Sequence, residues 1–182
     1  MLFAPDTLAT LDFTVALANT HPSASKSGLD ELSTPEELTA LVTAHGYSGR
    51  FDRDLAELED VRETRELFRS TWHLDRDGVA VEANRMMREA NALPYLIRHD
   101  SVDWHLHATE SDARLVDRII GETAIAFADV IRSQEWPRLR ECEADDCDGV
   151  LADLSRNGSK RFCSVRCGNR MNMVAFRERQ QG

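Results

Sequence analysis

The sequence predicts an α+β protein in two parts: a mostly helical N-terminal domain with a small antiparallel β element, and a small cysteine-containing C-terminal domain. Segments of helical periodicity fill the first two thirds of the 182-residue chain, whereas all four cysteines fall in the last third. Charge divides the chain at the same place. Residues 1–135 carry 13 basic and 25 acidic side chains, net −12, and residues 136–182 carry 9 and 7, net +2. We therefore expect domains at 1–135 and 136–182.

Two helices are expected in the first half of the N-terminal domain. Thr34 and Glu37 have the spacing of a capping box, which marks a helix start. Gly46 supplies a stop, so this helix should cover residues 35–45. Over residues 51–69, apolar side chains keep approximate helical spacing among dense charge, which predicts a half-buried helix.

A turn, a third helix and a hairpin should follow. Residues 77–78, Asp-Gly, are typical of a turn. A helix is predicted over residues 81–93 and should end before Pro94, because the residue preceding proline disfavours helical geometry. The β-rich segments 95–97 and 102–107 surround a short polar link, which predicts an antiparallel hairpin.

A long helix should complete the N-terminal domain. Residues 112–134 contain the longest apolar stripe of the chain, and Pro137 lies just past its end. The stripe consists of Val116, Ile119, Ile120, Phe127, Val130 and Ile131. Helices therefore outnumber strands in the predicted domain.

Composition excludes several classes of protein. No run approaches the roughly 18 apolar residues that span a membrane. The first 18 residues have no basic region typical of a secretory signal, so we expect a cytoplasmic protein. A uniform charge of −10 would repel phosphate, so nucleic-acid binding would have to rest on local charge. Residues 153–182 supply such a charge, with seven basic and two acidic side chains, net +5.

The cysteines have the spacing of a structural zinc site. Cys142 and Cys147 are separated by four residues, Cys163 and Cys167 by three, and the two pairs by fifteen. Two close pairs can supply the four thiolates of a tetrahedral site. Two disulfides or four unrelated buried thiols are the alternative. Because four thiolates leave no position for water, we expect one structural zinc ion and no catalytic metal.

Local signals around the cysteines predict a treble-clef arrangement. A knuckle is expected over residues 138–147, a strand over 150–154 and a returning strand over 160–162, with Asn-Gly in the turn between the strands. Ser164 can cap a helix that reaches about Arg179. The helix N-terminus would then face the thiolates and favour their negative charge.

The C-terminal residues resemble the bacterial CGNR zinc finger. The motifs that carry the resemblance are Cys142-x4-Cys147, Asp153, Ser155-Arg156-Asn157-Gly158, Lys160-Arg161-Phe162 and Cys163-x3-Cys167-Gly168-Asn169-Arg170. In this family the finger follows an ABATE domain. The first part of this chain resembles that domain in its Asn19-Thr20 pair near the start and in its place before the finger. The resemblance implies an α+β N-terminal domain, zinc on the four cysteines, and a proposed DNA-binding role in stress-induced transcription regulation.

Basic side chains of the predicted finger form a candidate DNA surface. Advancing about 100° per residue from Cys167 places Arg166, Arg170 and Arg177 in one narrow stripe. The full set of candidate nucleic-acid contacts is Arg156, Lys160, Arg161, Arg166, Arg170 and Arg177. Arg156 and Arg170 have an alternative role, which is to brace the turn and the helix.

A second face of the predicted finger helix is apolar. Val165 and Phe176 lie away from the metal side. We expect this face to pack on the N-terminal domain or on another subunit, so a homodimer is one possible assembly.

Other side chains of the N-terminal domain are assigned structural roles. His105 and His107 alternate on one side of the predicted strand, a spacing that can hold metal, but no third ligand is evident. We interpret them as exposed or hydrogen-bonded strand residues. Trp72, Trp104 and Trp136 are interpreted as core or interface anchors.

Three functions are compatible with these features. No catalytic triad order, phosphate-binding loop or dinucleotide glycine run is present, so we do not expect an enzyme. The leading hypothesis is a transcription regulator whose finger binds DNA and whose N-terminal domain senses a ligand or partner. The alternative is a protein-interaction adaptor whose zinc finger is purely structural. A third is a small-molecule sensor or enzyme with a pocket lined by His73, His105 or Trp104.

Overall fold

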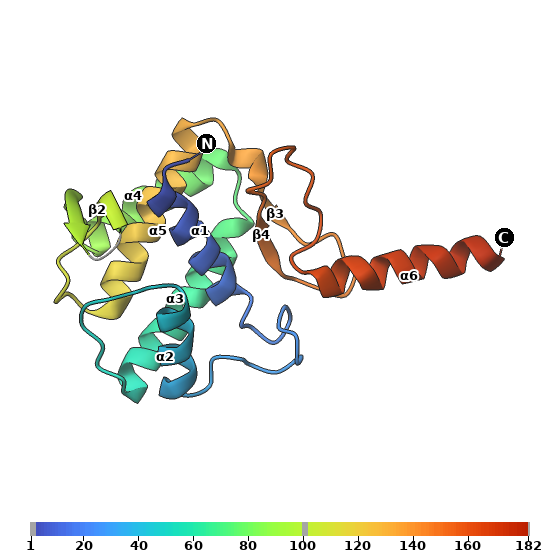
Figure 1. The fold of residues 1–182 in the computed structure, drawn as a ribbon, viewed down its shortest axis with the longest axis horizontal. Helices are drawn as coiled ribbons and strands as arrows, with labels where there is room; N and C mark the ends of the chain where they lie inside the picture. The colour runs from blue at the N-terminus through green and yellow to red at the C-terminus, as the bar shows by residue number, and fades with distance from the viewer. Residues whose placement is uncertain (1–2, 100–101, 182) are drawn as a thin grey trace.

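The computed structural model describes residues 3–99 and 102–181 and has an α+β fold (Figure 1). A helical body is followed by a small C-terminal unit from which the last helix projects. The helices are α1 (Pro5–Ala18), α2 (Pro35–Ala44), α3 (Leu55–Trp72), α4 (Arg76–Glu89), α5 (Leu115–Arg132), the 3-10 helix η1 (Trp136–Arg138) and α6 (Val165–Gln181). The strands are β1 (Tyr95–His99), β2 (Val102–His107), β3 (Leu139–Glu141) and β4 (Val150–Ala152).

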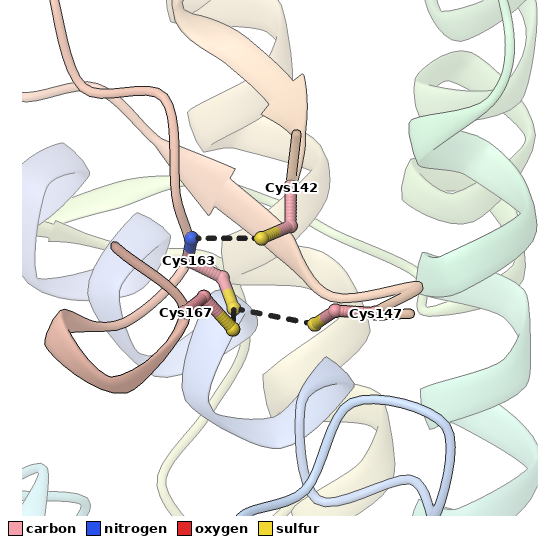
Figure 2. Close-up of side chains that lie close together, drawn as sticks. All are labelled: Cys142, Cys147, Cys163 and Cys167. Carbon is pink, nitrogen blue, oxygen red and sulfur yellow. Dashed lines mark hydrogen bonds between the residues drawn. The ribbon is translucent and has the colours of Figure 1, made fainter. Parts of the chain in front are cut away.

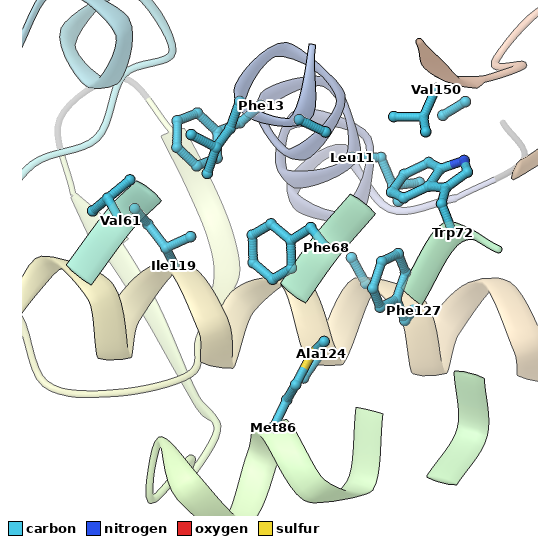
Figure 3. Close-up of a cluster of buried hydrophobic side chains, with 14 of the residues drawn as sticks. Leu11, Phe13, Val61, Phe68, Trp72, Met86, Ile119, Ala124, Phe127 and Val150 are labelled. Atoms are coloured by element: carbon cyan, nitrogen blue, oxygen red, sulfur yellow. The ribbon is translucent and has the colours of Figure 1, made fainter. Parts of the chain in front are cut away.

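Helix α5 forms the centre of the body and packs against α4, α1 and α3. Fully buried aromatic side chains from three helices, Phe13, Phe68 and Phe127, meet in this core (Figure 3). Burial of each such side chain stabilises the fold by roughly 1.5 to 3 kcal/mol. Val150 of β4 belongs to the same apolar cluster, so the C-terminal unit shares the core of the helical body.

Helix starts follow the capping signals of the sequence. Thr34 and Glu37 form the predicted capping box at α2: the backbone N–H of each donates to the side chain of the other, at 3.2 Å in both directions. Asp54 caps α3 in a similar way, accepting from the backbone N–H of Glu57 at 2.8 Å. These bonds satisfy N–H groups that the first helical turn leaves without partners.

Two helices of the N-terminal domain differ from the sequence-based expectation. The turn predicted at residues 77–78 is wrong, because α4 begins at Arg76 and contains both residues in its first turn. Asp75 accepts a hydrogen bond from the N–H of Gly78 at 2.8 Å, and this cap outweighs the turn preference of Asp-Gly. Helix α1 was not predicted from the sequence, and its N-cap residue Ala4 makes no side-chain capping bond.

The predicted hairpin is present as antiparallel strands β1 and β2, with an irregularity between Ile97 and His99. Asp100 and Ser101 of the predicted link lie outside the described residues. Trp104 on β2 is 64% exposed and is not a core anchor, whereas Trp72 is 4% exposed and packs edge-on against Phe127. No helix in the described part of the chain is long and apolar enough to cross a membrane.

The strand pairing in the C-terminal unit corrects the predicted hairpin. Strand β4 pairs antiparallel with β3, with Leu139 opposite Ala152 and Glu141 opposite Val150. Residues 160–162, expected to be the returning strand, have no strand structure. Strand β4 pairs with β3 and not with residues 160–162, because Leu139 of β3 is buried in the main core together with Val150 and Ala152 of β4.

Candidate metal centre and nucleic-acid interface

The four cysteine sulfurs converge on one point between the knuckle and the start of α6 (Figure 2). All lie within 4.8 Å of one another, and Cys163 Sγ lies 3.7 Å from the sulfurs of both Cys147 and Cys167. A tetrahedral zinc ion with Zn–S bonds of about 2.3 Å would separate its sulfurs by about 3.8 Å. The donor set and its spacing therefore fit one zinc ion with a closed coordination shell.

Backbone hydrogen bonds hold the ligands in this arrangement. The N–H of Cys142, just after β3, donates to the carbonyl of Gly149 at 2.7 Å and so closes the knuckle. Cys163 N–H donates to Cys142 Sγ at 3.4 Å, which links the two ligand pairs. The predicted cap is confirmed, because Ser164 Oγ accepts from the N–H of Cys167 at 3.2 Å.

A buried carboxylate organises the turn that replaces the expected hairpin. Asp153 is 0% exposed and accepts hydrogen bonds from the backbone N–H groups of Ser155 (3.0 Å) and Lys160 (2.7 Å). Burial opposes its ionisation, but the hydrogen bonds from Ser155 and Lys160 outweigh that effect and lower the pKa of Asp153. Arg140 binds the same turn through the carbonyl of Gly158 at 2.9 Å. This contact of Arg140 was not predicted from the sequence.

Three of the six basic side chains predicted to contact DNA are already bonded to other residues of the protein. Arg170 pairs with Asp146 at 2.5 Å, and Arg161 pairs with Glu143 at 2.6 Å. Arg166 donates to the carbonyl oxygen of Lys26 in the N-terminal domain.

The remaining basic residues are more open. The exposed side chains of Arg156, Lys160 and Arg177 form no ion pair with any residue of the described ranges. Of the two arginines with an alternative bracing role, Arg170 is therefore engaged within the finger and Arg156 is not.

The apolar face of α6 does not pack on the N-terminal domain, so of the two expected partners only another subunit remains a prediction. Val165 is 79% and Phe176 50% exposed. The reason is the direction of α6, which leaves the metal site and extends away from the helical body (Figure 1). Met171, on the metal side of the same helix, packs against the cysteine cluster.

Asn19, the residue after α1, joins the two parts of the protein. Its Nδ2 donates to the carbonyl of Val150 and its Oδ1 accepts from the N–H of Val150, both at 2.8 Å. Because 131 positions separate these residues, no local signal in the sequence could reveal the pairing. A second contact lies nearby, where the N–H of Asp148 donates to the carbonyl of Ser23 at 3.2 Å.

Two buried arginines of α3 hold the loop that follows Asn19. Arg65 is almost fully buried and binds Asp30 at 2.6 and 3.0 Å, and Arg69 donates to Ser23 Oγ at 2.9 Å. The hydrogen bond from Arg65 lowers the pKa of Asp30 and outweighs the opposing effect of burial. The loop is therefore fixed from one side by α3 and meets the finger on the other.

Replacement of Asn19 should destabilise the whole chain. We expect Asn19→Ala to lower the free energy of unfolding by about 2 to 4 kcal/mol, because the buried N–H and C=O of Val150 both lose their partner. Asn19→Asp keeps the acceptor but loses the donor, and should also be destabilising. Urea unfolding measures both effects, with Asn172→Ala, at an exposed position of α6, as the control. Equal stability of Asn19→Ala and the wild type would contradict the interpretation.

A cavity of about 490 Å³ lies at the same junction. Its lining includes Asn19 and Lys26 from the N-terminal domain and Cys147, Cys163 and Arg166 from the finger. The pocket considered in the sequence analysis, lined by His73, His105 or Trp104, does not coincide with it, since none of the three lines this cavity. On β2, His105 Nε2 lies 3.1 Å from His107 Nε2, and the described residues provide no third ligand for a metal there.

Comparison with known families gives two matches. The model described as CGNR zinc finger matches residues 138–180. The ABATE model, with the description "Putative stress-induced transcription regulator", matches residues 11–134. A search of curated proteins gives no match. The resemblance inferred from the sequence motifs is thereby confirmed for both parts of the chain.

Proposed function

Since the chain belongs to the ABATE family and carries a CGNR zinc finger, we propose that it is a transcription regulator that binds duplex DNA through this finger. Zinc would be held by Cys142, Cys147, Cys163 and Cys167 and would serve to fix the position of α6. The zinc ion would be structural and not catalytic, because four thiolates fill a tetrahedral coordination shell and leave no position for water.

The observation that carries this proposal is the position of Arg177 on α6. The helix projects from the acidic body (Figure 1), and its 17 residues extend about 25 Å. A helix of this kind fits the major groove, where arginine can contact phosphate or guanine. Arg156 and Lys160 of the finger add two exposed cations with no carboxylate partner in the described ranges. Arg161, Arg166 and Arg170 would have to exchange their present partners for phosphate.

Titration of duplex DNA at several salt concentrations tests the proposal. We expect binding that weakens as salt rises, and we expect Arg177→Ala to reduce the slope of log K against log salt by about 0.9, the effect of one phosphate contact. Arg132→Ala is the matched control, because Arg132 is an exposed arginine on α5, outside the finger. Absence of binding at low salt would reject the proposal, and equal slopes for the two variants would reject the role of Arg177.

The N-terminal domain would sense a ligand or partner. The cavity at the junction supports this role, because its volume lies within the usual range for small-molecule sites and its walls come from both parts of the chain. Occupancy there would act directly on the contacts between Lys26 and Arg166.

The alternative function is a protein-interaction adaptor with a purely structural zinc finger. The ion pairs of Arg161 with Glu143 and of Arg170 with Asp146 favour it, because they neutralise part of the basic surface. Under this alternative, DNA would fail to bind at any salt concentration while zinc content and folding remained normal. The same titration therefore separates the two functions.

A further inference from the structure

The four cysteines are unequally accessible. Cys142 and Cys167 are buried, whereas Cys147 and Cys163 are partly exposed. Cys147, Cys163 and Cys167 line the junction cavity and Cys142 does not, but Cys167 is only 4% exposed. A small molecule that enters the cavity therefore meets the sulfurs of Cys147 and Cys163.

The local packing also distinguishes this pair. Cys147 Sγ and Cys163 Sγ are 3.7 Å apart, the same separation as between Cys163 Sγ and Cys167 Sγ. The first pair also lies against Gly149, which has no side chain to separate or cover its two sulfurs. The buried sulfurs are more protected: Cys142 Sγ accepts the N–H of Cys163, and Cys167 Sγ is contacted by the guanidinium of Arg170 at 3.6 Å. Cysteines that are buried are the less reactive ones.

From this geometry we propose that Cys147 and Cys163 form a peroxide-reactive pair, which hydrogen peroxide entering the cavity oxidises to a disulfide. One thiolate attacks the O–O bond, becomes a sulfenic acid and expels hydroxide. The second thiolate attacks that sulfur, forms the S–S bond and expels a second hydroxide. Two solvent protons convert the hydroxides to water, so the two sulfurs lose the two electrons that the peroxide gains.

Oxidation would dismantle the finger. It removes two of the four thiolate ligands, and a disulfide sulfur does not replace a thiolate as a metal ligand. An S–S bond of about 2.05 Å would also draw the two sulfurs together from 3.7 Å, over Gly149. Oxidation of the pair therefore releases the ion and detaches the start of α6 from the knuckle. A thiol reductant and added zinc would restore the finger.

The test uses the full-length zinc-loaded protein and hydrogen peroxide. A colorimetric chelator follows zinc release, and peptide mass spectrometry identifies the disulfide. We expect zinc release together with a Cys147–Cys163 disulfide, both reversed by dithiothreitol and zinc. Zinc that stays bound in peroxide would overturn the proposal, as would a main product containing Cys142 or Cys167. Neither readout depends on DNA binding, so the outcome is independent of the proposed regulator function.

A variant that narrows the cavity tests the route of entry. Ala24 lines the cavity, and Ala24→Phe should slow zinc release in peroxide several-fold without changing zinc content before oxidation. Ala44→Phe, at an exposed position at the end of α2, adds the same side chain away from the cavity and should react at the wild-type rate. Equal rates for Ala24→Phe and the wild type would overturn entry through the cavity.

Discussion

Removal of zinc by a strong chelator is expected to unfold residues 142–147 and α6 while β3 and β4 stay folded on the helical body. Apart from the four cysteines, the apolar cluster around the metal site contains Ala144, Phe162 and Met171 among the described residues. So small a cluster does not hold a helix by itself, whereas structural zinc supplies on the order of 10 kcal/mol. Strands β3 and β4 have a second support, because Leu139 and Val150 belong to the main core.

Hydrogen exchange followed by mass spectrometry measures which segments unfold when zinc is removed. Peptides from α6 should lose protection when zinc is removed, and peptides from β3, β4 and α5 should keep it. Zinc added back should restore the protection of α6. Cys142→Ser should reproduce the effect of the chelator, since it removes one ligand. Full protection of α6 in the zinc-free protein would contradict a metal-dependent finger.

Gly149→Ala is expected to abolish tight zinc binding and to loosen the junction with the N-terminal domain. A Cβ atom at this position would lie 2.8 Å from Cys163 Sγ and 3.2 Å from both Cys147 Sγ and Asn19 Oδ1. Contacts this short require the sulfurs or the asparagine to move, and the sulfurs cannot move without losing tetrahedral geometry. The variant should therefore combine loss of zinc with a stability loss like that of Asn19→Ala.

Gly46→Ala provides a contrasting control. Gly46 has a φ of +73°, and no atom lies within 4 Å of the place that an added Cβ atom would take. Alanine at this position would therefore strain the backbone without a steric clash. Its cost should be about 1 kcal/mol, with full zinc content. Zinc content measured by atomic spectroscopy and urea unfolding of both variants make the comparison. Normal zinc affinity in Gly149→Ala would show that the ligand cluster tolerates the displacement.

Local signals in the sequence were sufficient to locate most helices and the metal ligands. The capping box of Thr34 and Glu37 marks the start of α2, and the Ser164 cap forms as expected. The cysteine spacing identified all four ligands because zinc imposes its own geometry on any chain that brings four thiolates together. Where a local signal competed with another, as Asp-Gly did with the Asp75 cap, the sequence led to a wrong boundary for α4.

The surroundings of the metal site depended on contacts between distant positions. Residues 150–152 can pair with a strand on either side, and burial of Leu139 with Val150 in the main core decided for β3. The junction through Asn19 and Val150, 131 positions apart, had no local signature. Nor did the helical wheel of α6 show that Arg166 would bind the N-terminal domain while Arg177 stayed open.

The sequence by itself therefore determined the two-part α+β organisation and the four cysteine ligands, because periodicity, caps and ligand spacing act over a few residues. Only the tertiary structure decided the strand partner of β4, the direction of α6, the engagement of each arginine and the cavity that exposes Cys147 and Cys163. These features follow from how distant surfaces pack together, and the energy of that packing is shared among residues that no short sequence pattern connects.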